Sequence, residues 1–320
     1  MTFTAENILL IGAILIFCSI LISKTGYRFG IPTLLLFLLV GMGFGSDGLG
    51  LQFDSAIDAQ FIGMIALSII LFTGGMDTKL TDIRPVLTQG ILLSTVGVLL
   101  TTLLTGGFIY YLSQWTSTNI SMSFLTCLLL AATMSSTDSA SVFNLLRSQK
   151  MNLKENLRPM LELESGSNDP MAYMLTIVII QFIGGEVSGA GSILLSFGQQ
   201  FLFGGAIGYG VGKLAVYIIN KLNLDNKSLY SVFMLAVAFF TFAFTDLFKG
   251  NGYLAVYIAG MIIGNSKIAN RKEVATFFDG LTWLFQIVMF ILLGLLVNPK
   301  EMLGVAPVAL LIGAFMILVG

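Results

Sequence analysis

Apolar runs of roughly 20 residues recur along the whole chain and alternate with short polar connections. A run of about 20 residues spans the hydrocarbon core of a bilayer as a single helix. Because these segments are apolar on every helix face, the pattern favours helices in lipid over amphipathic helices on a soluble core. We therefore predict an all-α polytopic membrane protein with about eleven spans, at residues 7–23, 31–46, 59–76, 86–112, 122–146, 159–184, 191–220, 229–248, 252–266, 274–297 and 302–320.

Two of these spans have unusual lengths. The seventh, 191–220, is long enough to be tilted or kinked, and the ninth, 252–266, is short enough to be a broken or partly spanning element. Both carry glycines four residues apart, which let helices approach closely in lipid, and we interpret them as packing positions rather than binding positions. These small-residue stripes are Gly204, Gly208 and Gly212 in the seventh span and Gly260 and Gly264 in the ninth.

The composition supports a membrane protein and narrows the chemistry. Hydrophobic residues make up 56% of the chain and charged residues 10%, against about 25% charged in soluble domains, and the mean hydropathy is +0.92. A net charge of −1 and the lack of a basic tail give no indication of nucleic-acid binding. Cys18 and Cys127 lie in apolar runs and are typical of small buried hydrophobes. The chain has no histidine and no glycine-rich phosphate loop, so we expect no cofactor and no enzyme, and any response to pH must rest on carboxylates.

The cationic residues predict the orientation of the chain. They fall 14 to 2 on alternate sides of the expected spans, and the poorer side holds only Lys249 and Lys300. Connections rich in Lys and Arg face the cytoplasm, which places the N-terminus outside. The richer side holds Lys24, Arg28, Lys79, Arg84, Arg147, Lys150, Lys154, Arg158, Lys213, Lys221, Lys227, Lys267, Arg271 and Lys272.

Two acids lie near mid-depth of neighbouring spans. Asp138 belongs to the fifth span and Asp169 to the sixth, and the short connection makes these helices antiparallel neighbours. A charged side chain inside a span costs about 3 kcal/mol or more, so such residues are functional candidates. The alternative is a structural pair that holds two helices together, although Ser or Asn would do this without the cost of a charge.

Polar neighbours surround each of these acids. Hydroxyl side chains compete with the helix for backbone bonds, so the run around Asp138 predicts locally unwound backbone whose carbonyls can bind a cation. In the sixth span, Pro170 cannot donate to the carbonyl of Gly166, which predicts a kinked, softened turn. The neighbours of Asp138 are Ser135, Ser136, Thr137 and Ser139, and the sixth span offers Ser165 with Asp169 and Glu164 with Asn168 as pairs on two faces.

These oxygen ligands suit a hard cation and imply an exchange reaction. A carboxylate at mid-membrane holds a proton or a monovalent cation, but hardly both. If the site faces each side of the membrane in turn, this competition exchanges the cation for protons. Because Asn168 beside Asp169 is uncharged, the pattern favours a one-for-one, electroneutral exchange.

The motifs ESGSNDPMA at 164–172 and SSTDSASVF at 135–143 resemble those of the monovalent cation:proton antiporter-1 family, most closely its bacterial potassium/proton antiporters of the NhaP2 type. The segments FTGGMDTKLTDIRP, NGYLAVYIAGMIIGN and FFDGLTWLFQIVMFILLGL are also similar, so the likeness covers the whole chain. It implies inverted repeats, about thirteen helices with crossed, partly unwound helices at the site, and a homodimer in the bacterial inner membrane.

The resemblance also implies roles for single residues. Asp169 would bind the cation or the proton, with Asp138, the Thr137 carbonyl and the Ser165 hydroxyl as further ligands. Glu164 would support the site through water, and Asn168 would hold the tip of the unwound helix. Two positions depart from the family pattern: Ser139 replaces a proline, and Thr73 replaces an acid before the glycine pair of the third span.

Eleven spans are fewer than the family's about thirteen, so we expect residues 1–320 to form an antiporter domain that lacks the last two helices and a C-terminal cytosolic region. Three functions stay open at this point. The first is a monovalent cation/proton antiporter, for which the resemblance favours K⁺ although the residue chemistry does not exclude Na⁺. The second is a cation channel, and the third is a membrane scaffold without transport, in which the acids only join helices.

Overall fold

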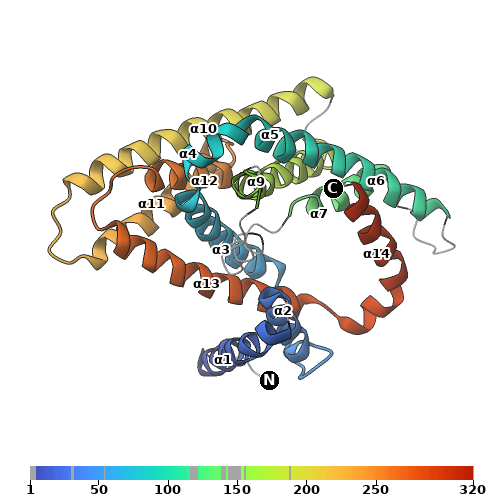
Figure 1. The fold of residues 1–320 in the computed structure, drawn as a ribbon. Helices are drawn as coiled ribbons and strands as arrows, with labels where there is room; N and C mark the ends of the chain where they lie inside the picture. The colour runs from blue at the N-terminus through green and yellow to red at the C-terminus, as the bar shows by residue number, and fades with distance from the viewer. Residues whose placement is uncertain are drawn as a thin grey trace. The chain divides into compact units, whose positions relative to one another are not determined.

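The structure is a computed structural model that describes residues 5–29, 32–53, 55–115, 122–137, 142, 153–154, 156–186 and 189–319. The described residues form helices and no strands. Up to the fifth expected span, the helices are α1 (Ala5–Phe29), α2 (Thr33–Phe44), α3 (Ala56–Asp77), α4 (Leu80–Ile83), η1 (Arg84–Val86), α5 (Leu87–Leu92), η2 (Leu93–Gly97), α6 (Val98–Trp115) and α7 (Phe124–Met134). They are followed by α9 (Leu157–Ile183), α10 (Ala190–Lys221), α11 (Ser228–Leu247), α12 (Gly252–Gly264), α13 (Arg271–Leu296) and α14 (Pro299–Val319) (Figure 1).

Ten of the eleven expected spans coincide with a helix or with a run of consecutive helices, and the fifth contains α7 in its first half, so the all-helical membrane fold is confirmed. The fourth span is the run from Leu80 to Trp115, which includes the π-helical η2. Six helical segments of the described chain are long and apolar enough to cross a bilayer, and the other apolar helices are shorter. The number of crossings therefore stays a prediction.

The chain divides into two compact units, Met1–Ile70 with Asp279–Pro307 and Leu71–Phe278 with Val308–Gly320. In the first unit, α2 and α13 cross where Gly41 meets Gly294. A Cβ atom added to Gly41 would lie 2.9 Å from the Cα atom of Gly294, so neither helix tolerates a side chain at this crossing. This close packing explains the glycine-rich end of the second span.

A polar cluster joins two distant connections of the first unit. Asp47, in the connection after α2, accepts a hydrogen bond of 2.9 Å from the backbone N–H of Lys300 in the first turn of α14, and its other oxygen lies 3.2 Å from Lys300 Nζ. Ser46 Oγ donates to Asn298 Oδ1 at 2.7 Å. Asp47 therefore caps α14 from a remote part of the sequence, where a carboxylate also complements the helix dipole.

Replacing Asp47 by Asn is expected to lower the thermal stability at neutral pH but not in acid. The backbone N–H of Lys300 holds the pKa of Asp47 below its ordinary value of 3.8. A lowered pKa means that the stabilisation is complete above the ordinary value and is lost as the pH falls through the lowered value. Melting temperatures of the two proteins should thus begin to converge below about pH 4 and meet only below the lowered pKa of Asp47. The exposed Asp58, changed to Asn, serves as the control, and a gap that persists in acid would contradict the cap.

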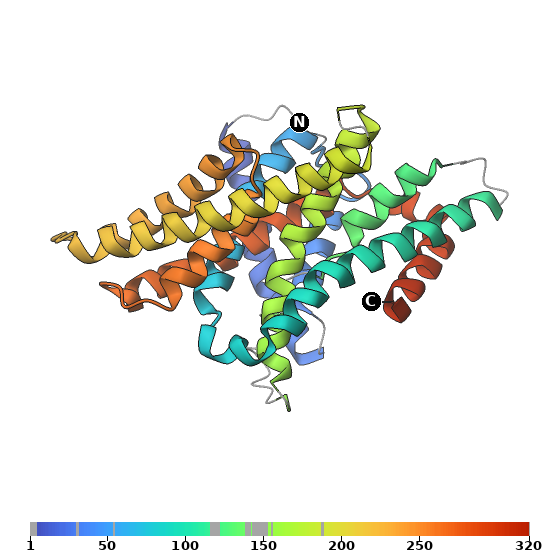
Figure 2. The same ribbon diagram turned by 90° about the horizontal axis from the view of Figure 1, so that it is seen from above.

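The second unit is built around the short helix α12, which α10 follows along its length (Figure 1). Most side chains of α12 are buried. Both predicted glycine stripes are packing positions: a Cβ atom on Gly208 would lie 2.5 Å from the Ala255 carbonyl oxygen, and one on Gly260 would overlap the carbonyl of Phe72 in α3. The ninth span is short because protein rather than lipid surrounds it. On another side of this unit, α7 runs beside α6 (Figure 2).

Candidate functional site

The helix of the fifth span ends well before the end of the apolar run. Ser123 caps the start of α7 by accepting from the Thr126 N–H at 3.1 Å, and α7 ends at Met134. The Ser135 hydroxyl donates to the Ala132 carbonyl at 2.8 Å, and Ser135, Ser136 and Thr137 are not helical. The unwinding predicted from the hydroxyl-rich run is thus confirmed for these three residues. Asp138 and Ser139, also predicted for the site, lie outside the described residues.

A buried amide in α9 holds this unwound end. Asn168 is 1% exposed, and its Nδ2 donates to Thr137 Oγ1 at 2.6 Å and to Glu164 Oε1 at 2.8 Å. The hydroxyls of Thr137 and the fully buried Ser165 lie 3.3 Å apart, within hydrogen-bonding distance. Four of the predicted site residues therefore meet across the contact of α7 and α9, and the predicted pair of Glu164 and Asn168 is a direct hydrogen bond.

The side-chain carbonyl oxygen of Asn168 differs from its Nδ2 group in hydrogen bonding. Among the described residues, Asn168 Oδ1 is buried and has no hydrogen-bond partner. A buried acceptor without a donor is costly, and an ion or a water commonly satisfies it. Together with the hydroxyls and the Glu164 carboxylate, this oxygen makes a donor set that suits a hard cation.

Asp169 lies on the same turn and is half-buried. It follows Asn168 directly, so its side chain points about 100° around α9 from the amide, and Ser165 stands one turn before it. The carboxylate is therefore at the edge of the buried polar contact, and the residue is only partly covered by the helices around it.

The sixth span is one continuous helix that contains Pro170, and the kink predicted at this turn stays a prediction. The structure shows α9 as one helix from Leu157 to Ile183, with Pro170 inside it. Pro170 lacks the N–H that would bond the Gly166 carbonyl, but the turn keeps its helical form because α12 supports it. The Tyr257 ring fills the space beside Gly166, where a Cβ atom would lie 2.7 Å from Tyr257 Cε2. Asn251 Nδ2 donates to the Pro170 carbonyl at 2.8 Å.

Asn251 and Tyr257 are residues of this region that the sequence did not predict. Both are buried, and they lie in the segment NGYLAVYIAGMIIGN that resembles the antiporter family. The Tyr257 hydroxyl lies 3.4 Å from Thr78 Oγ1 at the end of α3. An asparagine before a short apolar helix was the available signal, since Asn is a common helix cap, but its partner in α9 is 81 residues away.

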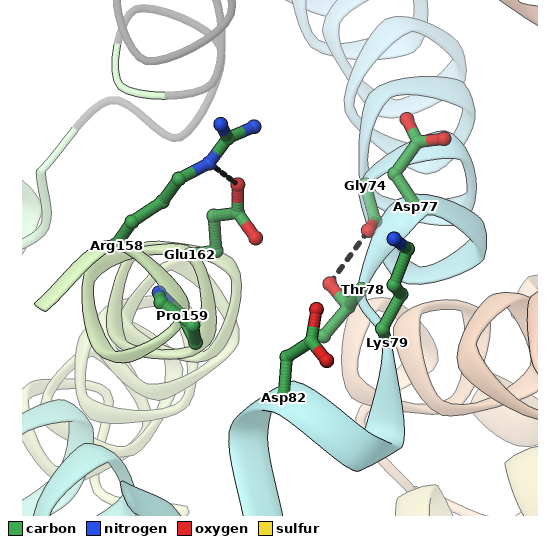
Figure 3. Close-up of a pocket in the computed structure, with 8 residues that line it drawn as sticks. All are labelled: Gly74, Asp77, Thr78, Lys79, Asp82, Arg158, Pro159 and Glu162. Carbon is green, nitrogen blue, oxygen red and sulfur yellow. Dashed lines mark hydrogen bonds and ion pairs between the residues drawn. The ribbon is translucent and has the colours of Figure 1, made fainter. Parts of the chain in front are cut away.

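A cavity of about 390 Å³ lies near the start of α9, between this helix and the connection of α3 to α4 (Figure 3). Glu162 lines this cavity and pairs with Arg158 at 3.0 Å. Asp77 and Asp82 also line it. Glu162 precedes Glu164 by about half a turn of α9, so the cavity and the buried contact lie on different faces of this helix.

Known proteins are similar to this chain in sequence and in fold. The family described as "Sodium/hydrogen exchanger, transmembrane" matches residues 12–319. The chain belongs to this family. It is 40% identical over 314 residues to the K(+)/H(+) antiporter NhaP of Alkalimonas amylolytica, covering 98% of this chain and 53% of that protein. It is 38% identical to the K(+)/H(+) antiporter NhaP2 of Shewanella sp. (strain MR-4), covering 94% and 51%.

The exchanger fold is also shared with a solved structure. The sodium proton antiporter MjNhaP1 from Methanocaldococcus jannaschii at pH 8 superposes with a TM-score of 0.80 at 22% identity, covering 97% of this chain and 75% of that one. This likeness confirms the fold class predicted from the sequence. The chain spans about half the length of the curated exchangers that it matches.

Proposed function

We propose that this exchanger-family protein is a secondary transporter that exchanges a monovalent cation for protons by alternating access. The observation that carries the proposal is the buried contact between the unwound end of α7 and the turn of α9 that holds Asn168. It gathers hydroxyl, amide and carboxylate oxygens in a helix bundle and leaves a buried amide oxygen for a cation. Unwound backbone that lines such a contact is typical of transporter sites.

In this proposal, Asp169 is the group for which the cation and the proton compete. Ser165, Thr137 and Asp138 are further cation ligands, and Glu164 supports them from one turn away. Asn168 fixes the unwound end through Thr137 and Glu164. Ser136 and Ser139 complete the hydroxyl-rich run, whereas Gly166 and Pro170 shape the turn of α9 on its other side.

We infer K⁺ as the favoured cation and keep Na⁺ as the alternative. Two of the relatives that share 38–40% identity, NhaP and NhaP2, are named K(+)/H(+) antiporters. Na⁺ has support from a relative at 28% identity, the Probable Na(+)/H(+) antiporter 2 of Methanocaldococcus jannaschii. Hydroxyl, amide and carboxylate oxygens bind either ion.

We further propose that one cation is exchanged for one proton, since Asn168 rather than a second acid stands beside Asp169. The resemblance to potassium/proton antiporters of the NhaP2 type supports a homodimer in the bacterial inner membrane, and the distribution of Lys and Arg supports an N-terminus outside. A transporter of this kind needs no cofactor.

The test is a transport assay on the purified protein in proteoliposomes. A pH dye is enclosed in the vesicles, and K⁺, Na⁺ or choline is added outside. Exchange predicts alkalinisation of the interior with K⁺, a smaller effect with Na⁺ and none with choline. Because the exchange is electroneutral, a voltage-clamped membrane with the protein should carry no cation-dependent current.

Other outcomes identify the other functions. A cation current that persists without a proton gradient would indicate a channel, and cation-dependent current coupled to protons would contradict the one-for-one stoichiometry. No movement of protons or cations in vesicles that contain folded protein would overturn the transport proposal.

A further inference from the structure

We propose that Asn251, which lies just before α12, is a positioning residue for the cation site. Its side-chain amide holds the turn of α9 that carries Asp169, without itself contacting the ion. The inference rests on the proposed exchange function, and it assigns a role in that function to a residue 81 positions from its partner.

The hydrogen bonds of Asn251 connect three helices. The residue is 1% exposed, and its Nδ2 donates to the Pro170 carbonyl at 2.8 Å, while its Oδ1 accepts from the Leu254 N–H at 2.9 Å. Its backbone N–H donates to the Gln200 carbonyl in α10 at 3.0 Å. A helix cap needs only an acceptor, which Ser, Thr or Asp supplies as well. The bond to Pro170 needs an N–H donor in the same side chain, and asparagine provides both.

The hydrogen bond from Asn251 to the Pro170 carbonyl acts on the turn of α9 that lacks a helical hydrogen bond. Because Pro170 has no N–H, the turn between Gly166 and Pro170 lacks one of its own hydrogen bonds, and Asp169 lies in this turn. The amide of Asn251 supplies a bond from outside at the end of the same turn. It therefore replaces part of the stiffness that the proline removes.

The turn is held from two sides. Ser165 and Asn168 face Thr137 at the unwound end of α7, whereas Gly166 and Pro170, one turn apart on another face, contact α12. The side chain of Asp169 projects between these two faces. A small rotation of α9 would move Asp169 away from the ligands at Thr137 and Ser165, and the Asn251 bond opposes that rotation.

The support itself is fixed. A Cβ atom on Gly204 of α10 would lie 2.9 Å from the Asn251 carbonyl oxygen, so α10 packs directly against the residue. Further along α12, the backbone of Ala255 lies against Gly208 in the same way. Asn251 thus connects the turn that Pro170 weakens to closely packed helices, which is what a positioning residue requires.

Two substitutions separate positioning from capping. Asn251→Ser and Asn251→Thr keep an oxygen that caps α12, but their hydroxyls are one bond too short to replace the amide at Pro170. The matched control is Asn220→Ser, at the end of α10. Asn220 also donates to a backbone carbonyl, that of Lys267 at 2.8 Å, and accepts from a backbone N–H, that of Ala269 at 2.9 Å.

The measurement is the concentration of K⁺ that gives half-maximal proton exchange in proteoliposomes. Loss of a buried hydrogen bond should raise this concentration about tenfold in Asn251→Ser and Asn251→Thr, with the maximal rate within about twofold of wild type. Asn220→Ser should leave the concentration unchanged. Melting temperatures of the purified variants report the separate, structural contribution of the cap.

Three results would overturn the inference. Half-maximal concentrations equal to that of wild type in both Asn251 variants would exclude a positioning role. A lowered melting temperature with an unchanged half-maximal concentration, or failure to fold, in both cap-retaining variants would assign Asn251 to stability alone. Absence of cation-dependent exchange in the wild-type protein would overturn the proposed function, and the positioning role with it.

Discussion

Replacement of Asp169 by Asn is expected to abolish cation-dependent proton exchange. The amide has nearly the same size, so the turn of α9 should keep its packing, but it neither releases a proton nor offers a charge to the cation. Loss of a carboxylate–cation contact in a partly buried site costs about 3 kcal/mol or more, which corresponds to at least about a hundredfold loss of activity. The alkalinisation of dye-loaded vesicles should fall to the level of vesicles without protein.

The control for this change is Asp225→Asn, which makes the same substitution at an exposed acid in the connection between α10 and α11. It should exchange cations at the wild-type rate. Melting temperatures of both variants establish that the proteins are folded. Exchange in Asp169→Asn within about twofold of wild type would exclude Asp169 as the carrier of the proton.

The helices could be predicted from the sequence because one physical rule determines them. A segment in lipid must be long, apolar and internally hydrogen-bonded, and the eleven apolar runs satisfy this rule. The neighbours of each helix could not be predicted in this way. The stripe of Gly204, Gly208 and Gly212 predicts close packing, but nothing in it identifies α12 as the helix that fits against it.

The site could be predicted where local chemistry decides the structure. The hydroxyl-rich run after α7 competes with helical bonds, and residues 135–137 are unwound. The spacing of Glu164 and Asn168 predicts a bond along one helix face, and the structure shows this bond. Both predictions depend on residues within about one turn of each other.

The contacts that distant parts of the chain make could not be predicted. Asn251, just before α12, and Tyr257, within α12, contact the turn of α9 that Pro170 weakens. The sequence also does not show that Asp77 and Asp82, at the connection of α3 to α4, lie opposite the start of α9 across a cavity. Tertiary contacts over long sequence separations thus account for what the sequence analysis missed.

The support that α12 gives to the site depends on the glycine at its closest contact with α10. Gly208→Val is expected to lower the melting temperature of the purified protein by about 5–10 °C. The Cβ atom alone would lie 2.5 Å from the Ala255 carbonyl oxygen and 2.8 Å from the Ala255 Cα atom. Both are backbone atoms of a buried helix and cannot turn aside, so α10 and α12 must separate and lose contacts along their length.

Gly210→Val is the matched control, because it adds the same side chain two residues further along α10. Gly210 is exposed, and no atom lies within 4 Å of its Cβ position, so the melting temperature of the Gly210→Val protein should stay within about 2 °C of wild type.

Separation of α12 from α10 in the Gly208→Val protein would also move Asn251 away from Pro170. Gly208→Val protein that still folds should therefore need more K⁺ for half-maximal exchange, as Asn251→Ser does. Equal melting temperatures for the two valine variants would show that α10 and α12 accommodate the added side chain without loss of stability. In that case α12 cannot be the fixed support of the Asp169 turn.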